Sequence, residues 1–369
     1  SVDADDSTTW AIGTHAFADC TAITSVTIGN NVIGDYMFYG DTSLESITIP
    51  ATVEYIGTHA FALCTRLNSA SIATTELGAY MFVDDESLTN ITLLDSVTEI
   101  PAYAFYRSYL TSIVIPSTVV RVGISAFEES SHLVSITLNN AVIGERMFKD
   151  CISLPNVTIP ACTSVGDSAF EGCVGLLRVD LSNANMIGSN MFKGCERLGS
   201  ETTYTLNITS NTTTIGASAF EDCVGLYSAT INSTIIGQNM FKGCTLLHAI
   251  TINSNVTEIG ESAFENCTTM QAAIIKNAFT SNNMFAGCFS LTSVEFSSNA
   301  EYVGNYSFKD CVNLTSVNIP SNIFRSVGTG AFQNCSSILE LVIPRSTTAI
   351  GEGAFNGCAN LQDLTIPFV

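Results

Sequence analysis

Basic residues are scarce in this chain. Lysine and arginine together number 13, against 34 aspartates and glutamates, so the formal net charge is −21 over 369 residues. A chain of this charge repels both a phosphate backbone and an anionic membrane surface. We therefore expect no nucleic acid among its partners.

Long apolar runs are also absent. No stretch approaches the roughly 18 uninterrupted apolar residues of a membrane span, which predicts no membrane insertion by this segment. The residues from Ser1 to Asp6 have neither the basic nor the apolar region of a signal peptide, and no initiator methionine precedes them. A processed or recombinant fragment explains both observations, so they do not decide where the natural protein resides.

A phenylalanine recurs throughout the chain at nearly constant spacing. It stands at Phe17, Phe38, Phe61, Phe82, Phe105, Phe127, Phe148, Phe170, Phe192, Phe220, Phe241, Phe264, Phe285, Phe308, Phe332 and Phe355. The intervals are 21 to 24 residues, except for one of 28 between Phe192 and Phe220. A period of roughly 20 to 29 residues is typical of leucine-rich repeats, which grow coil by coil around one continuous core.

Each coil ends in a short alternating segment, such as Ile47-Thr48-Ile49 or Val157-Thr158-Ile159. This period of two predicts a half-buried strand, and one strand per coil predicts a parallel sheet. A glycine stands four residues before most of the repeat phenylalanines, which indicates positive φ or a close backbone approach. Segments such as 167–171 are long enough only for a single turn of α or 3₁₀ helix.

These patterns predict a leucine-rich-repeat solenoid of about 16 stacked coils. A parallel β-sheet is expected on one face, with short turns, 3₁₀ or single-turn helical segments on the other. We expect an N-terminal lead-in over residues 1–10 and a single solenoid over residues 11–369. The interval of 28 residues predicts an insertion near residues 199–204.

Twelve of the 13 cysteines stand three residues after a repeat phenylalanine, and Cys162 alone is out of register. A disulfide framework or a metal site are the functional alternatives to buried free thiols. Parallel side chains in register suit disulfide geometry poorly, and no zinc-like spacing occurs. We therefore predict unbridged, buried thiols, with Cys162 as the candidate for exposure.

The unit Cys-x-x-Leu-x-x-Ile-x-Ile-Pro, followed by Ile-Gly-x-x-Ala-Phe-x-x-Cys, resembles the BspA-like or treponemal type of leucine-rich repeat. Residues 11–367 fit this unit. Members of that family are surface or secreted proteins of mucosal bacteria and protozoan parasites, implicated in adhesion to host cells and to extracellular matrix, including fibronectin. The resemblance implies that role here. The alternating Met-Phe and Ala-Phe coils lean towards protozoan members such as those of trichomonads.

Little in the chain suggests catalysis. The histidines His15, His59, His132 and His248 are dispersed, and no Ser/His/Asp or Cys/His arrangement follows from their spacing. Acidic runs do not recur with the coils as calcium-binding repeats do. We expect no enzyme, no cofactor and no bound metal.

Hydroxyl groups recur on the outward side of the predicted strands. They belong to Thr27, Thr48, Ser71, Thr92, Thr137, Thr158, Thr230, Thr251 and Thr365. Such a strand face is the ligand-binding side of many repeat solenoids. Threonine also suits a strand for its own sake, so this row is either a candidate ligand-binding face or a well-made sheet.

Ten Asn-x-Ser/Thr sequons occur, and those at Asn207 and Asn211, beside the insertion, are the best placed for a glycan. We predict a non-enzymatic binding or adhesion module, displayed on the cell surface or secreted. It would present its solenoid face to a host-cell or extracellular-matrix protein, fibronectin-like, or to a glycan. The alternative is a general protein-interaction scaffold, possible inside a cell because free thiols suit a reducing compartment.

Overall fold

The computed structural model describes residues 13–201, 204–320 and 324–366. These residues divide between Asn139 and Asn140 into two compact units, here called the N-terminal and the C-terminal unit. The predicted lead-in over residues 1–10 lies outside the described residues, as do residues 202 and 203 of the predicted insertion. The expectation of one solenoid over residues 11–369 stays a prediction.

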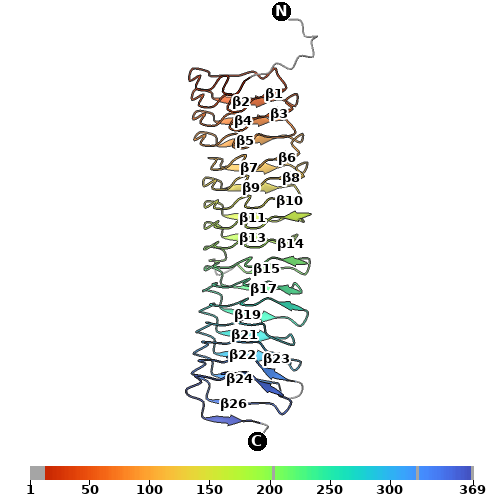
Figure 1. The fold of residues 1–369 in the computed structure, drawn as a ribbon, viewed down its shortest axis with the longest axis vertical. Coiled ribbons are helices and arrows are strands. Elements are labelled where there is room, and N and C mark those ends of the chain that lie inside the picture. The colour runs from red at the N-terminus through yellow and green to blue at the C-terminus, as the bar shows by residue number, and fades with distance from the viewer. Residues whose placement is uncertain (1–12, 202–203, 321–323, 367–369) are drawn as a thin grey trace, which may run out of the picture. The chain divides into compact units, whose positions relative to one another are not determined.

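In the N-terminal unit, the longer strands form one parallel sheet in chain order, with each strand in register with the next. These strands are β2 (Ser46–Ile49), β4 (Ser69–Ile72), β5 (Asn90–Leu93), β7 (Ser112–Ile115) and β9 (Ser135–Leu138) (Figure 1). Two-residue strands pair on another side of the coils: β1 (Val32–Ile33) with β3 (Tyr55–Ile56), and β6 (Glu99–Ile100) with β8 (Arg121–Val122). The coils are therefore closed by two separate rows of strands.

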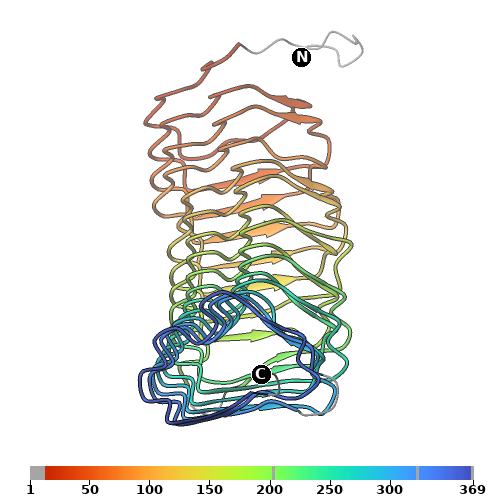
Figure 2. The ribbon, with the colours of Figure 1, turned by 60° about the horizontal axis from the view of Figure 1, so that its bottom comes forward.

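In the C-terminal unit, the row of longer strands is divided into four parallel sheets. They are β11 (Asn156–Thr158) with β13 (Arg178–Asp180); β15 (Leu206–Ile208) with β17 (Ala229–Ile231); β19 (Ala249–Ile252), β21 (Ala272–Ile275), β22 (Ser293–Phe296) and β24 (Ser316–Asn318); and β26 (Glu340–Val342) with β28 (Asp363–Thr365). The row of two-residue strands comprises β10 (Val142–Ile143), β12 (Ser164–Val165), β14 (Met186–Ile187), β16 (Thr214–Ile215), β18 (Ile235–Ile236), β20 (Glu258–Ile259), β23 (Tyr302–Val303), β25 (Ser326–Val327) and β27 (Ala349–Ile350). The oblique view of Figure 2 shows the coils of this unit as successive loops. Both units are parallel-strand solenoids, as predicted.

The core of each coil is built around the repeat phenylalanine. Phe170 is fully buried, and its ring stacks on those of Phe148 and Phe192 with centroid distances of 5.3 and 5.6 Å. The strands add their inward side chains, as in β2, where Ile47 and Ile49 are buried between exposed neighbours. Each coil therefore buries its apolar residues mainly against the coils before and after it.

The side of the coil that carries the phenylalanine consists of turns, which is the first of the predicted alternatives. The described residues contain no helix, so the helical alternatives are not supported. Positive φ occurs two residues before and two residues after the phenylalanine, as at Ser168 (58°) and Gly172 (70°) around Phe170. A helix requires consecutive negative φ. The backbone N–H of Phe170 instead donates to the carbonyl of Met191 in the next coil at 2.9 Å.

The glycine four residues before the phenylalanine serves close approach rather than positive φ. A Cβ on Gly166 would lie 2.2 Å from the backbone nitrogen of Glu145, and a Cβ on Gly260 would lie 2.1 Å from that of Gln238. Neither glycine has positive φ. Any side chain here would collide with the backbone of the preceding coil, which explains the bias towards glycine.

Candidate ligand-binding face

Eight of the nine hydroxyl residues predicted as a ligand-binding face lie on the outward side of the longer strands. Ser71 and Thr251 are half-buried. The exposed ones are Thr27, Thr48, Thr92, Thr137, Thr158, Thr230 and Thr365. Thr27 precedes the first of the longer strands and belongs to no assigned strand.

The structure brings only part of this set together. Thr48 is the register partner of Ser71, and Ser71 that of Thr92, so three hydroxyl residues are consecutive in the N-terminal unit. Elsewhere other side chains interrupt the row, and the register places Val114 opposite Thr137, Asp180 opposite Thr158, Asn207 opposite Thr230, Ile274 opposite Thr251, and Val342 opposite Thr365. The face is therefore mixed, with hydroxyl, apolar, amide and charged patches.

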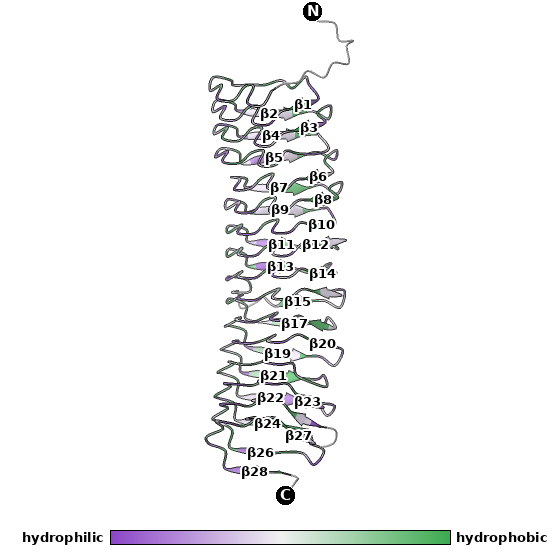
Figure 3. Ribbon diagram, viewed as in Figure 1, coloured by the Kyte–Doolittle hydropathy of each residue, from purple (hydrophilic) through white to green (hydrophobic). Residues whose placement is uncertain are grey.

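Three hollows lie on this face in the C-terminal unit, and each one lies where pairing of the longer strands is interrupted. The first, of about 340 Å³, lies between β13 and β15. The second, also about 340 Å³, is lined by Thr230 and Thr251 between β17 and β19. The third, of about 300 Å³, lies between β24 and β26. In Figure 3 the strands beside the first hollow, β11 and β13, are coloured hydrophilic.

Tyr204, the last residue of the predicted insertion, lines the first hollow. The hydroxyl of Tyr204 donates to the carbonyl oxygen of Val179 at 2.9 Å and accepts the N–H of the same residue at 3.2 Å. In an unbroken sheet these two groups of β13 would bond to the next strand. The Arg178 guanidinium donates to Glu201 Oε2 through Nε at 2.9 Å and through Nη2. Tyr204 and Glu201 are thus attached to β13, the first at the backbone of Val179 and the second at the side chain of Arg178.

Gly199 begins the insertion and has a φ of 75°. A Cβ there would lie 2.7 Å from Leu226 Cδ1 and 3.5 Å from the Tyr204 ring. Burial raises the pKa of the Tyr204 phenol above its usual range, so its hydroxyl remains protonated at neutral pH and can donate. The insertion was predicted from the interval, but the role of Tyr204 depends on contacts across 25 residues.

Sequence reasoning missed an aromatic ladder in the N-terminal unit. His15, Tyr36, His59, Tyr80 and Tyr103 occupy the position two residues before the phenylalanine in consecutive coils. Their rings stack in order with centroid distances of 4.6, 4.8, 4.9 and 4.8 Å. The equivalence of His15 and His59 was visible in the sequence, and aligning the intervening coils would have found the tyrosines.

The ladder presents ring edges and hydroxyl groups to solvent, because each inner ring face is covered by its neighbours. Partial burial lowers the pKa of His59, and the nearby Asp35 carboxylate opposes this effect. His59 Nδ1 lies 2.9 Å from Thr58 Oγ1. The other two histidines do not join this ladder: His132 stacks on Tyr109 and His248 on Tyr227.

The prediction of unbridged thiols is confirmed, since all 13 cysteines are free. In the registered column the thiol donates to the phenylalanine carbonyl of the preceding coil, as Cys173 does to Phe148 at 3.2 Å. Burial raises the pKa of Cys173 to about 12. The prediction of an exposed Cys162 is wrong, because this residue is 4% exposed and the Asn185 side chain bonds both its N–H and its carbonyl. Cys20, in the first described coil, is exposed instead.

Two coils of the N-terminal unit carry buried aspartates in the cysteine column. Asp85 Oδ1 accepts the N–H of Cys64 at 2.7 Å, and Asp41 Oδ1 accepts that of Cys20 at 2.8 Å. The second carboxyl oxygen of each residue is buried without a hydrogen-bond partner. Burial raises the pKa of Asp85 well above its usual range and that of Asp41 to about 6.

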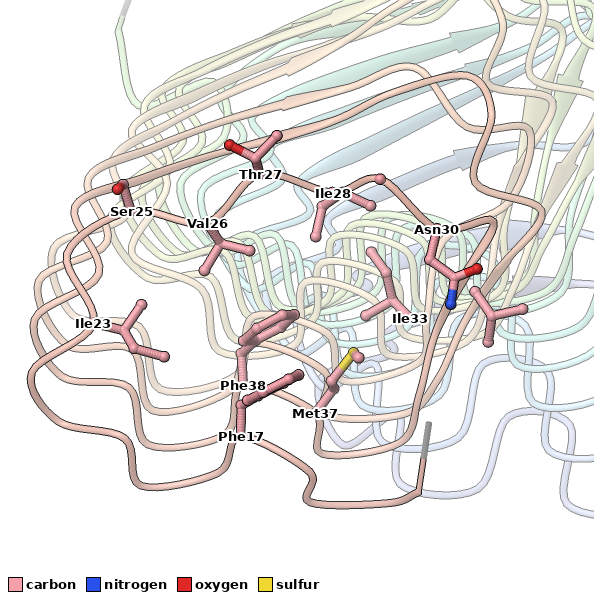
Figure 4. Close-up of a pocket in the computed structure, with 12 residues that line it drawn as sticks. Phe17, Ile23, Ser25, Val26, Thr27, Ile28, Asn30, Ile33, Met37 and Phe38 are labelled. Atoms are coloured by element: carbon pink, nitrogen blue, oxygen red, sulfur yellow. The ribbon is translucent and has the colours of Figure 1, made fainter. Parts of the chain in front are cut away.

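A hollow lies within the first described coil. Figure 4 shows Phe17, Met37 and Phe38 among the side chains around a hollow of about 340 Å³. The hollow is the mainly apolar interior of a coil.

Within residues 13–201, 204–320 and 324–366, no group of three or more His, Cys, Asp or Glu side chains is placed to hold a metal ion. Over the same ranges no helix is long and apolar enough to cross a membrane.

The stacked coils, their parallel strands and the buried phenylalanine and cysteine columns together define a leucine-rich-repeat protein. The chain belongs to the BspA type of this class: residues 3–109, 98–223, 183–281 and 279–368 match the family described as BspA type Leucine rich repeat region (6 copies). A comparison with curated proteins found no match.

Solved structures of similar proteins include several from bacteria. A leucine-rich repeat protein from Bacteroides ovatus is 25% identical, with a TM-score of 0.67 over 92% of this chain and 91% of that one. A leucine rich cell surface protein from Faecalibacterium prausnitzii is 24% identical, with a TM-score of 0.45 over 88% of each chain. A leucine rich repeat protein from T. pallidum is 21% identical, with a TM-score of 0.37 over 59% of this chain and 83% of that one. The lean towards protozoan members stays a prediction.

Proposed function

We propose that this chain is a non-enzymatic binding module, displayed on a cell surface or secreted, that attaches to a host-cell or extracellular-matrix protein or glycan through the outward face of its longer strands. The family and the fold are those of leucine-rich-repeat proteins, a type of protein-interaction scaffold. The observation that carries the proposal is the row of exposed polar side chains in register on this face.

A repeated face of this kind binds its partner over a large area. Each exposed hydroxyl or amide offers a weak contact, and many such contacts in a row, together with multivalent display, yield useful attachment. The net charge of −21 favours a basic partner, so attachment to a protein should weaken as salt concentration rises.

The test is attachment of a four-site variant, Thr137→Lys, Thr158→Lys, Thr230→Lys and Thr251→Lys, to host cells and to immobilised matrix proteins. Its matched control carries lysine at four exposed threonines beside the short strands instead: Thr98, Thr163, Thr213 and Thr257. Both variants change the net charge equally. We expect weaker attachment for the first variant only, with unchanged thermal melting. Equal attachment by the two folded variants would remove this face from consideration.

A general interaction scaffold inside a cell is the second candidate. The free thiols favour it, because unbridged cysteines persist in a reducing compartment. Localisation of the full-length protein by surface labelling of intact cells separates the two: a labelled protein supports display, and a protein labelled only after lysis supports the scaffold.

A further inference from the structure

We propose that the hollow between β13 and β15 is a subsite for one neutral saccharide unit. This inference deepens the proposed function and rests on it only in taking the strand face as the binding surface. Arg178, Asp180, Thr158, Tyr204 and Asn207 are among the residues that line the hollow.

The state of the β13 edge argues against an extended peptide. A peptide added to a sheet edge needs backbone N–H and C=O groups that are still available. At Val179 both groups already bond to the hydroxyl of Tyr204. Recognition in the hollow therefore falls to side chains.

Those side chains offer donors and acceptors in alternation. Asp180 contributes carboxylate oxygens, of which Oδ1 also accepts the N–H of Ser182. Arg178 contributes the guanidinium N–H groups that do not bond to Glu201, and Thr158, the register partner of Asp180, contributes a hydroxyl that can both donate and accept. All three are exposed. The paired strands β11 and β13, which carry Thr158 and Asp180, are about 4.8 Å apart, a spacing comparable to the width of one sugar ring. Adjacent hydroxyls of a sugar each donate and accept, so this alternation suits them.

Charge selects a neutral ligand over an anionic one. The guanidinium of Arg178 is already paired with Glu201, and Asp180 adds a second carboxylate, so the three groups together carry one negative charge. A phosphate or a sialic acid would meet this charge and the general acidity of the chain.

The other two hollows on the face lack this combination. The hollow between β17 and β19 has no charged residue in its lining, and the hollow between β24 and β26 has only Glu340. The first hollow is thus distinguished by its charged lining and by Tyr204, which bonds to the backbone of β13.

The experiment uses the full chain from a bacterial host that does not N-glycosylate, because Asn156 and Asn207 line the hollow and both begin sequons. Glucose, galactose, mannose, fucose, N-acetylglucosamine and N-acetylgalactosamine are titrated by saturation-transfer NMR and calorimetry, with sialic acid as the anionic comparison. The variants are Asp180→Ala, Tyr204→Phe and the matched control Glu295→Ala, which removes an exposed carboxylate from the same outward row.

We expect one or more neutral sugars to bind the wild type with a dissociation constant on the order of millimolar, as for a shallow polar site. Asp180→Ala should weaken binding by about tenfold or more, the effect of losing a hydrogen bond to a charged group. Tyr204→Phe should also weaken it, and Glu295→Ala should not. Sialic acid should not bind.

Lack of binding by the folded wild type to every neutral sugar, or equal binding by Asp180→Ala and Glu295→Ala, overturns the subsite. Attachment to cells that persists in Asp180→Ala while sugar binding is lost would leave the proposed function intact. Attachment of the four-site variant is measured separately: its loss supports the proposed function, and equal attachment by that variant and its control contradicts it.

Discussion

The two units share the same coil but carry different side chains at two positions beside the repeat phenylalanine. Two residues before the phenylalanine, the N-terminal unit carries the aromatic ladder from His15 to Tyr103, whereas most coils of the C-terminal unit carry serine or asparagine there. One residue after the phenylalanine, the C-terminal unit alternates charge in the order Lys149, Glu171, Lys193, Glu221, Lys242 and Glu265. The first five coils of the N-terminal unit have no charged residue at this position.

Equivalent positions of successive coils form a column of side chains, and the difference shows that each column has its own pattern of residues. Equivalent residues of adjacent coils are neighbours, so each side chain must suit those one coil away. Aromatic rings accordingly stack on aromatic rings, and Lys149, Lys193 and Lys242 lie 3.4, 3.3 and 3.1 Å from the glutamates that follow them. Within each unit, the backbone of the coil tolerates either kind of column.

Sheet continuity also separates the units. The N-terminal unit has one unbroken sheet of five strands, whereas the C-terminal unit is interrupted at three places, each with a hollow. A repeat solenoid therefore creates concave sites on its sheet face by interrupting pairing.

Replacing a core phenylalanine should lower the free energy of unfolding by about the same amount in either unit. Phe82 and Phe170 are both fully buried and stacked on two neighbouring rings. Phe82→Ala and Phe170→Ala should each destabilise by about 3 to 5 kcal/mol, from lost burial and the cavity left behind. Denaturant titration measures this. The surface control Val114→Ala should stay within about 0.5 kcal/mol, and a loss below about 1 kcal/mol for either phenylalanine would contradict the shared core.

Converting the N-terminal cysteine column to the pattern of the other unit should stabilise the chain. Asp85→Cys replaces a carboxyl that has a buried oxygen without a partner by a thiol of the kind that donates to a phenylalanine carbonyl in the neighbouring coils. We expect a gain of about 1 to 3 kcal/mol at pH 7. The measurement is chemical denaturation of the variant beside wild type, and no gain would mean that Asp85 is better satisfied than its surroundings indicate.

The same aspartates should make stability depend on pH. Because burial raises the pKa of Asp41 to about 6 and that of Asp85 well above its usual range, the folded chain holds protons that the unfolded chain releases. The stability that these two carboxyl groups contribute is fully present below their ordinary pKa of 3.8. It is lost as the pH rises through their pKa in the folded chain. Melting should therefore fall between pH 4 and pH 7. The double variant Asp41→Cys, Asp85→Cys should flatten this slope. Asp84→Asn removes only the smallest of the causes that raise the pKa of Asp85 and should keep most of the slope.

The smallest effect is expected in the charge column of the C-terminal unit. Glu221→Lys would place a third positive charge between Lys193 and Lys242 and should cost about 0.5 to 1 kcal/mol at low salt. The loss should shrink as salt rises, because the groups are partly exposed. Glu221→Gln, which removes the attraction without adding repulsion, should cost less. Identical losses for both variants at every salt concentration would show that the column is not held by charge.

Much of the fold could be predicted from the sequence because the repeat is local. The phenylalanine interval, the alternation in segments such as Ile47 to Ile49 and the cysteine register indicated parallel coils, inward apolar residues and buried thiols. The outward placement of Thr48 or Thr158 followed from the same alternation. The sequence did not decide between turns and helical segments on the phenylalanine side, because positive φ at positions such as Ser168 depends on hydrogen bonds to the next coil, which no local pattern reveals.

The sequence by itself determined the period, the strand positions and the side of each strand that faces the core, because these follow from spacing within one coil. The tertiary structure alone decided which residues become neighbours across coils: the ladder at Tyr36 and His59, the interruptions at Asp180 and Val114, and the bonds of Tyr204 to Val179. Those contacts join residues 20 or more positions apart. Their geometry is set by how coils stack, so the mixed binding face and its hollows appear only once the chain has folded.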